Sequence, residues 1–330
     1  MIVGGRELLD GLVKVLMERW TVVAPREVEG NVVLAPLEDA GEIVLDRPLN
    51  SPKEYLLPQE EILFEYRDGG FKAPEPRGYA ILGIRPCEFR ALLMLKSVMG
   101  EDPLFLSRWN SSFFAVQACT EPCPSGFCGD LGGPEFSGID PYRPLGAPDL
   151  QYYTLDGRVF VDALTERGKE VLGALRDLGE GATEEELERL RMRISEVWED
   201  MKRVRVVGIE ERARWDHPAY SYFAERCIQC GACNFECPSC FCFDIRDEDE
   251  GAWVRVREWD SCLLEGFSKM ALGANPRKRE EDRMRQRILH KFKYFKETTG
   301  FYMCTGCGRC LEACPSGIDL REVISWLWRE

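Results

Sequence analysis

Two apolar runs in the first half of the chain predict buried β-strands. Residues 78–87 form one run that ends in an Arg-Pro-Cys turn, and residues 112–119 form another that opens into a loop rich in Gly, Pro and Cys. Between them, residues 88–99 repeat apolar side chains at the spacing that is typical of a helix. Shorter runs at 21–25 and 31–36, bounded by turn residues, add two more strands. Together these elements predict an α/β unit.

The pattern changes after residue 150. Residues 152–161 predict a hairpin with its turn at Asp156 and Gly157. Thr183 and the three glutamates after it form a capping-box pattern, which predicts a helix that continues through Trp198 towards Lys202. Nothing else in this segment indicates chemistry, so we interpret it as connector and packing.

In the last third of the chain, cysteine spacing is more informative than hydrophobicity. The spacing C-x-x-C-x-x-C-x-x-x-C-P occurs twice, at residues 227–238 and again at 304–315. This is the spacing of bacterial ferredoxins, where three thiolates of one run and the fourth of the other hold one cluster. Glycines inside each run let backbone N–H groups approach the cluster sulfides. Two complete copies predict two [4Fe–4S] clusters.

The crossed ferredoxin arrangement assigns the eight cysteines to two ligand sets. The first set is expected to be Cys227, Cys230, Cys233 and Cys314. The second set is expected to be Cys304, Cys307, Cys310 and Cys237. A structural zinc scaffold is the alternative from a different class of protein, because zinc also binds four thiolates.

Four further cysteines lie where the two predicted buried strands end. Cys87 follows the first strand, and Cys119, Cys123 and Cys128 lie in the loop after the second. Ligands gather at strand ends in α/β sheets, and four thiolates complete the shell of a [4Fe–4S] cluster, so a third cluster is predicted. Two alternatives stay open. Zinc takes the same four ligands, and free cysteines often fill protein cores as small hydrophobic residues.

Three cysteines remain outside these sets, namely Cys240, Cys242 and Cys262. One interpretation is that they line the cluster pocket as thiols. The alternatives are that they replace a predicted ligand or serve the cofactor of a partner protein. The two histidines, His217 and His290, are expected to be structural.

The long segment between the two cysteine motifs predicts helices at residues 260–273 and 277–298. The second helix carries nine cations and only four acids, although the net charge of the chain is −14. One interpretation is a solvated basic face. The other is that these cations, with Lys291, Lys293 and Arg309 as candidates, offset the charge of the clusters and raise their reduction potentials.

Composition narrows the class of protein. The chain has 330 residues, of which 45% are hydrophobic and 30% charged, as in soluble globular proteins of about two domains. Its acidity argues against a nucleic-acid partner. No apolar stretch approaches the roughly 20 residues that span a bilayer. Fifteen cysteines without a secretory signal indicate the cytoplasm, where thiols bind metal rather than form disulfides.

The whole chain is therefore expected to have an α+β fold in three segments. Residues 1–150 form an α/β domain with the candidate third cluster, and residues 151–212 form the connector. Residues 213–330 form an α-helical, ferredoxin-like domain with two clusters. The chain has no glycine-rich phosphate-binding fingerprint, so the sequence does not indicate that it binds a nicotinamide or ATP itself.

Several motifs together resemble one family, the iron–sulfur β subunit of cytoplasmic NAD(P)-linked sulfhydrogenases, which are [NiFe] hydrogenases. The related A subunit of anaerobic sulfite reductase is similar in the same places. The motifs are Gly83-Ile-Arg-Pro-Cys87-Glu-Phe-Arg-Ala91, Cys119-Thr-Glu-Pro122, Cys237-Pro-Ser-Cys-Phe-Cys-Phe-Asp244, Arg257-Glu-Trp-Asp-Ser-Cys262, Arg287-Ile-Leu-His-Lys-Phe292 and Cys304-Thr-Gly-Cys-Gly-Arg-Cys310. The resemblance covers most of the chain and is densest after Cys227.

The resemblance implies an electron-transfer subunit of a multisubunit oxidoreductase, without catalytic residues of its own. In such complexes a flavin subunit exchanges hydride with NAD(P)H and iron–sulfur subunits pass single electrons. The catalytic centre belongs to the small and large subunits of a [NiFe] hydrogenase, or to sulfite reductase subunits. The nearest alternatives are the A subunit of a sulfite or sulfur reductase and a quinone- or heterodisulfide-linked iron–sulfur subunit.

Overall fold

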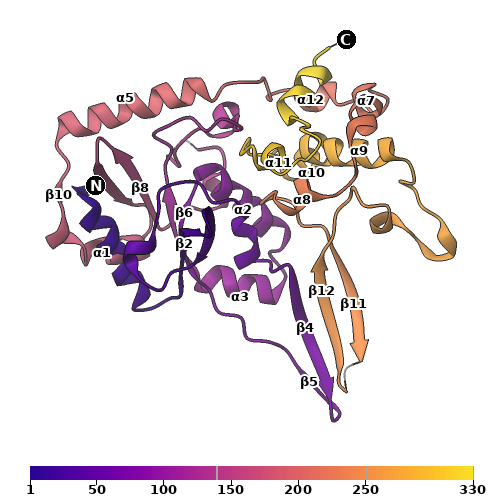
Figure 1. The fold of residues 1–330 in the computed structure, drawn as a ribbon, viewed down its shortest axis with the longest axis horizontal. Helices are drawn as coiled ribbons and strands as arrows, with labels where there is room; N and C mark the ends of the chain where they lie inside the picture. Colours follow the sequence, from indigo (N-terminus) through magenta and orange to yellow (C-terminus); the bar gives the residue numbers. More distant parts are fainter. Residues whose placement is uncertain (139, 250, 330) are drawn as a thin grey trace.

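The computed structural model describes residues 1–138, 140–249 and 251–329. Figure 1 shows three parts: a sheet with helices around the amino terminus, a narrow strand arm, and a group of helices at the carboxy-terminal end. The predicted α+β class is confirmed. Among the described residues, none of the helices combines the length and the apolar character that crossing a membrane requires.

The first part is built on an eight-stranded sheet of order β10-β1-β9-β8-β7-β6-β2-β3. At its centre, β6 (Ala80–Ile84) and β7 (Phe113–Gln117) are parallel and buried along their whole length. Next to β6, β2 (Val22–Val28) is also parallel, and β3 (Asn31–Pro36) closes this edge as an antiparallel strand. The strands predicted in this region are thus present, and so is the predicted helix, α2 (Pro86–Val98).

The sheet continues past the predicted domain boundary at residue 150. The predicted hairpin consists of β8 (Leu150–Leu155), which is parallel to β7, and β9 (Arg158–Ala163). The far edge is formed by β1 (Ile2–Gly4) and β10 (Glu180–Gly181). The strands of the expected connector therefore belong to the same sheet as the α/β unit.

Helices cover both faces of this sheet because its strands bury side chains on both sides. Apolar residues of α1 (Arg6–Met17) and α4 (Glu166–Gly173) pack on one face. Those of α2 and α3 (Pro103–Ser111) pack on the other, where α2 leads away from the end of β6. The predicted capping-box helix is α5 (Glu184–Asp200), and Thr183 Oγ1 accepts a hydrogen bond from the backbone N–H of Glu186.

The strand arm is absent from the sequence-based predictions. It is a four-stranded antiparallel sheet of order β11-β12-β4-β5, formed by β4 (Glu60–Arg67), β5 (Gly70–Lys72), β11 (Phe243–Asp249) and β12 (Trp253–Trp259). In Figure 1 it extends away from the rest of the molecule. It joins the two halves of the chain, because Trp253 pairs with Tyr66 and Glu258 with Glu60.

The carboxy-terminal helices differ in part from the prediction. The predicted helix at 277–298 is present as α9 (Glu280–Leu289), a π-helical turn (His290–Tyr294) and α10 (Phe295–Thr299). The predicted helix at 260–273 is wrong. That segment has only short 3-10 turns, and Leu272 has a φ of 63°, which a right-handed helix cannot accommodate. The remaining helices of this part are α6 (Ile209–Arg212), α7 (Ala219–Arg226), α8 (Ala232–Phe235), α11 (Arg309–Glu312) and α12 (Leu320–Leu327).

Candidate iron–sulfur centres

The two cysteine motifs fold in the same way. In each motif a loop carries the first two cysteines, and a glycine with a φ of +78° then begins a one-turn helix. These glycines are Gly231, before α8, and Gly308, before α11. The left-handed backbone conformation at these positions is accessible to glycine without steric cost. The loop, glycine and short helix are thus repeated in both motifs.

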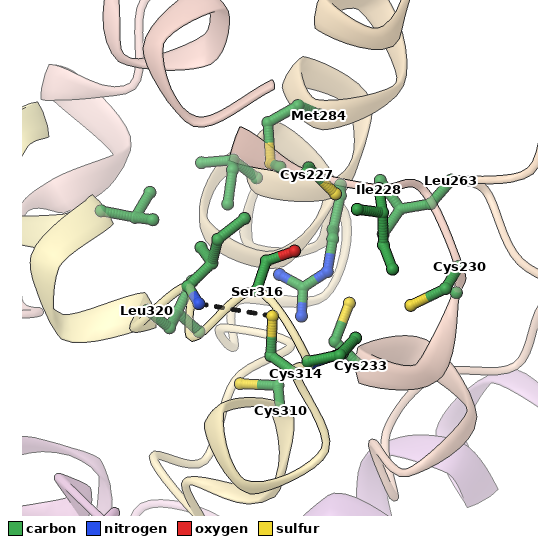
Figure 2. A pocket seen from close by; sticks show the side chains of 16 residues that line it. Cys227, Ile228, Cys230, Cys233, Leu263, Met284, Cys310, Cys314, Ser316 and Leu320 are labelled. Atoms are coloured by element: carbon green, nitrogen blue, oxygen red, sulfur yellow. Dashed lines mark hydrogen bonds between the residues drawn. The ribbon is translucent and has the colours of Figure 1, made fainter. Parts of the chain in front are cut away.

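The first predicted ligand set lines a single pocket. Figure 2 shows Cys227, Cys230, Cys233 and Cys314 around this space, with Cys310 of the second set at its border. The backbone N–H of Ile318 donates a hydrogen bond of 3.3 Å to Cys314 Sγ, drawn as the dashed line. Apolar side chains make up most of the other walls. Thiols from both motifs therefore meet as the crossed assignment predicts, and an N–H donor to sulfur is typical of iron–sulfur sites.

The second predicted ligand set is the most deeply buried of the three. Cys237, Cys304 and Cys307 are buried and Cys310 is half-buried. Burial raises the pKa of the Cys304 thiol to about 12, and the neighbouring thiols of Cys310 and Cys237 contribute to the increase. Thiolates in such surroundings need compensating positive charge, which bound iron supplies.

The third predicted ligand set borders one cavity in the amino-terminal part. Cys87 lies in the first turn of α2, Cys119 follows β7, and Cys128 begins a 3-10 turn (Cys128–Leu131). All four thiols of the set, Cys123 included, line the cavity. The ends of the parallel strands β6 and β7 thus bring together cysteines that are up to 41 positions apart in the sequence.

Arg47 faces the same cavity and was not identified from the sequence. Its Nε donates to Glu88 Oε1 at 3.3 Å and its Nη1 to Glu312 Oε1 at 3.1 Å. Its Nη2 is buried without a hydrogen-bond partner among the described residues. Burial alone would lower the pKa of Arg47, but Glu88 and the thiols of Cys307 and Cys87 raise it well above its usual value. A free guanidinium N–H at a cavity lined by four thiols fits an anionic iron–sulfur cluster.

The second set lies between the other two. Cys310 borders the pocket of the first set, whereas Cys307 packs in one buried group with Cys87 and Cys128 of the third set. The loops of the second and third sets are also joined through the backbone, because the N–H of Phe127 donates to the carbonyl of Gly306 at 2.8 Å. The three thiol sets therefore form a row, and we call the second set the middle set.

Two buried cations, Lys291 and Arg287, lie near thiols of the middle set. Lys291 Nζ lies 3.2 Å from Cys237 Sγ and 3.3 Å from Cys240 Sγ. Burial would lower the pKa of Arg287, but the thiols of Cys233 and Cys310 raise it well above its usual value. Four cations of the predicted basic helix are buried, namely Arg283, Arg285, Arg287 and Lys291. The helix is therefore not a solvated basic face along its whole length.

The other two candidate cations differ from Lys291 in their surroundings. Lys293 is half-buried, and no hydrogen bond or ion pair joins it to a cysteine among the described residues. Arg309 donates to Glu88 Oε1 at 2.6 Å and to the carbonyl of Leu49 at 2.7 Å. Its main contact is thus an ion pair with α2, which anchors the second motif to the amino-terminal part.

The remaining cysteines lie together beside the middle set. The neighbouring Cys242 thiol lowers the pKa of Cys262, and Asn234 Nδ2 donates to Cys262 Sγ at 3.2 Å. Lys53, which was also not identified from the sequence, donates from Nζ to the carbonyl of Cys240 at 3.1 Å. No residue pattern near position 53 or 47 signals these roles, since both depend on contacts between distant segments.

The two histidines have packing roles. His217 Nδ1 accepts a hydrogen bond of 3.1 Å from the backbone N–H of Ala219, and His290 packs edge-on against Phe241 and Phe295. In the described part of the chain, no group of three or more His, Cys, Asp or Glu side chains has the spacing that holds a single metal ion.

Comparison with known proteins agrees with this geometry. Residues 226–318 match the family described as the 4Fe-4S dicluster domain, and this range contains both cysteine motifs. Over 295 residues, the chain is 26% identical to the sulfhydrogenase 2 subunit beta of Pyrococcus furiosus. That similarity covers 86% of this chain and 85% of the relative. The predicted resemblance to sulfhydrogenase β subunits and the predicted [4Fe–4S] character of the chain are thus confirmed.

Proposed function

We propose that this chain is an electron-transfer subunit of a cytoplasmic, multisubunit oxidoreductase of the sulfhydrogenase type. It would relay single electrons between a flavin subunit that binds NAD(P)H and the small and large subunits of a [NiFe] hydrogenase. The observation that carries the proposal is the row of three four-thiol sets, joined through Cys310 and Cys307. [4Fe–4S] clusters bound to these thiols supply one-electron carriers.

The ligand assignment is part of the proposal. Cys227, Cys230, Cys233 and Cys314 would hold one outer cluster, and Cys87, Cys119, Cys123 and Cys128 the other. Cys304, Cys307, Cys310 and Cys237 would hold the middle cluster. This arrangement gives twelve thiols to three clusters and leaves three thiols outside the sets.

Burial along the row supports a relay with two outer ends. Cys237, Cys304 and Cys307 in the middle set are buried, so this part of the chain excludes water. At one end, Cys230 is exposed, and at the other, Cys119 and Cys123 are half-buried at the edge of their cavity. Each outer set therefore reaches the surface, where a partner subunit could exchange electrons with it.

The buried cations near the thiol sets would adjust the reduction potentials in such a relay. Lys291 and Arg287 bring positive charge to the middle set, and Arg47 brings it to the boundary between the middle and third sets. Positive charge and N–H donors near the thiolates favour the reduced, more negative state of each centre. These side chains would thus raise the reduction potentials along the row.

The first experiment is a measurement of iron and acid-labile sulfide in the full chain, purified without oxygen. We expect about twelve irons per chain, four for each cluster. Cys128→Ser and Cys314→Ser should each remove about four irons, whereas Cys262→Ser, outside the three sets, should remove none. About eight irons or fewer in the unmodified chain would contradict the assignment of three clusters.

A second experiment identifies the partners by anaerobic co-purification from the source cells. A flavin subunit together with [NiFe] hydrogenase subunits would support the relay proposed here. A sirohaem-containing partner would instead assign the chain to a sulfite reductase. Co-purification of a quinone-reducing or disulfide-reducing enzyme would also contradict the hydrogenase assignment.

A further inference from the structure

Cys240 lies beside Cys237, at one corner of the middle set. Lys291 Nζ is 3.2 Å from Cys237 Sγ and 3.3 Å from Cys240 Sγ, so one ammonium contacts both sulfurs. The backbone N–H of Cys240 donates to the carbonyl of Cys237 at 3.2 Å. This tight turn places the two side chains next to each other. Both cysteines are buried.

The charge around this corner requires anionic partners. Lys291 is buried, and in the described part of the chain its ammonium contacts sulfur and no carboxylate. Its contacts are the two sulfurs, so both serve as acceptors for its N–H groups. A buried cation without anionic partners is strongly unfavourable. The corner is therefore built to stabilise negative charge on either sulfur.

A second buried lysine holds the same turn in place. Lys53 Nζ donates to the carbonyl of Cys240 at 3.1 Å and to that of Asn234 at 3.3 Å. Its ammonium also lies 3.8 Å from the ring centre of Trp259. The position of Cys240 is thus fixed by contacts from the amino-terminal part of the chain.

The other motif provides an internal comparison. After Cys314 the chain reads Pro-Ser-Gly317, whereas after Cys237 it reads Pro-Ser-Cys240. Both turns are closed by the same hydrogen bond, because the N–H of Gly317 donates to the carbonyl of Cys314 at 3.0 Å, although Gly317 has a left-handed φ of 63° and Cys240 does not. The two motifs therefore share the hydrogen bond that closes this turn, and only the motif of Cys237 ends the turn with an additional sulfur.

We infer that Cys240 is a second ligand for the corner of the middle centre that Cys237 occupies, so that five thiols serve four irons. The inference rests on the proposed function, which assigns the middle centre to these motifs. In the exchange, the iron–sulfur bond to Cys237 breaks as the bond to Cys240 forms. The proton of the incoming thiol passes to the departing thiolate, and no electrons are transferred. Lys291 contacts both sulfurs and stabilises either ligand.

The decisive experiment compares Cys237→Ala with Cys314→Ala in the full chain purified without oxygen. Cys314→Ala should lose about four irons, because position 317 has no sulfur to replace the ligand. Cys237→Ala should keep its irons, with a changed EPR spectrum of the middle centre. The double variant Cys237→Ala/Cys240→Ala should lose about four irons.

The outcomes separate this inference from the proposed function. Equal iron loss in Cys237→Ala and Cys314→Ala overturns the role of Cys240 and leaves the three-cluster assignment intact. Retention of all iron in Cys314→Ala and in the double variant would instead contradict the ligand assignment itself.

A second comparison covers the case in which Cys237→Ala does not fold. Cys240→Ala keeps Cys237 and should contain all its iron, but it should lose iron several-fold faster than the unmodified chain during limited oxidation with ferricyanide. Cys242→Ala is the matched control and should lose iron at the unmodified rate. Equal rates in Cys240→Ala and the unmodified chain would overturn the inference.

Discussion

Arg309 and Glu88 form a buried ion pair, in which Arg309 Nε lies 2.6 Å from Glu88 Oε1. Arg309 belongs to the second cysteine motif, and Glu88 directly follows Cys87 of the third thiol set. Burial alone would raise the pKa of Glu88, but Arg309 and Arg47 lower it to about 2. The pair therefore fixes the carboxy-terminal motif to the start of α2.

Loss of the Glu88 carboxylate should destabilise the junction of the two parts. Glu88→Gln leaves Arg309 and Arg47 buried with less compensating charge, so we expect the free energy of unfolding to fall by about 3–5 kcal/mol. Anaerobic urea denaturation at pH 7 measures this change. Glu180→Gln is the control, because it removes an exposed pair with Arg158 and should change stability by at most about 1 kcal/mol. Equal effects of the two substitutions would contradict the prediction.

Lys291 should set the reduction potential of the middle centre. Lys291→Met removes a buried positive charge 3.2 Å from Cys237 Sγ, and the potential should fall by on the order of 100 mV. EPR-monitored redox titration measures the shift. Lys293→Met, a change in the same π-helical turn, should leave the potential nearly unchanged. A shift of similar size in both variants would mean that the effect is long-range and not due to the contact.

Arg47 should act on the middle and third centres together. Arg47→Met removes the guanidinium that lies near both Cys307 and Cys87, so both potentials should fall by on the order of 50–100 mV. The iron content should stay the same, because Arg47 is not an iron ligand. Arg47→Lys keeps the charge and should restore most of both potentials. The prediction fails if Arg47→Met shifts only one centre or if Arg47→Lys behaves like Arg47→Met.

Gly308 should be required for the contact between the second motif and the third-set loop. A Cβ at this position would lie 2.5 Å from the carbonyl of Ser125, and the φ of +78° disfavours other residues. Gly308→Ala should therefore reduce the iron of both the middle and third centres. Gly300→Ala has a similar φ, +83°, but open space around it. The Gly300→Ala variant should keep its iron. Iron loss in this control would mean that the iron loss in Gly308→Ala comes from backbone strain alone.

Helices, strands and caps that are determined by residues nearby in the sequence were predictable. The strand that became β6, the helix α2 and the capping box at Thr183 follow from local periodicity and turn residues. The strand arm was not predictable, because β4 and β12 are stable only when they pair, and they are separated by more than 180 residues. The helix expected at 260–273 was wrong, because this segment forms short 3-10 turns with a left-handed residue at Leu272. Leu263 is buried at the pocket of the first set, whereas Met270 and Leu272 are exposed, so the segment has no continuous apolar face to bury as a helix.

The sequence alone identified the cysteines that are candidates for binding iron, because cysteine spacing is a local property and each motif folds into its own loop and helix. The tertiary structure decided how the sets are arranged and which charges surround them. It placed Cys307 beside Cys87, and brought Lys53 to the turn of Cys240. These contacts join segments 100 or more residues apart, and only the packing of the two parts fixes which side chains meet there.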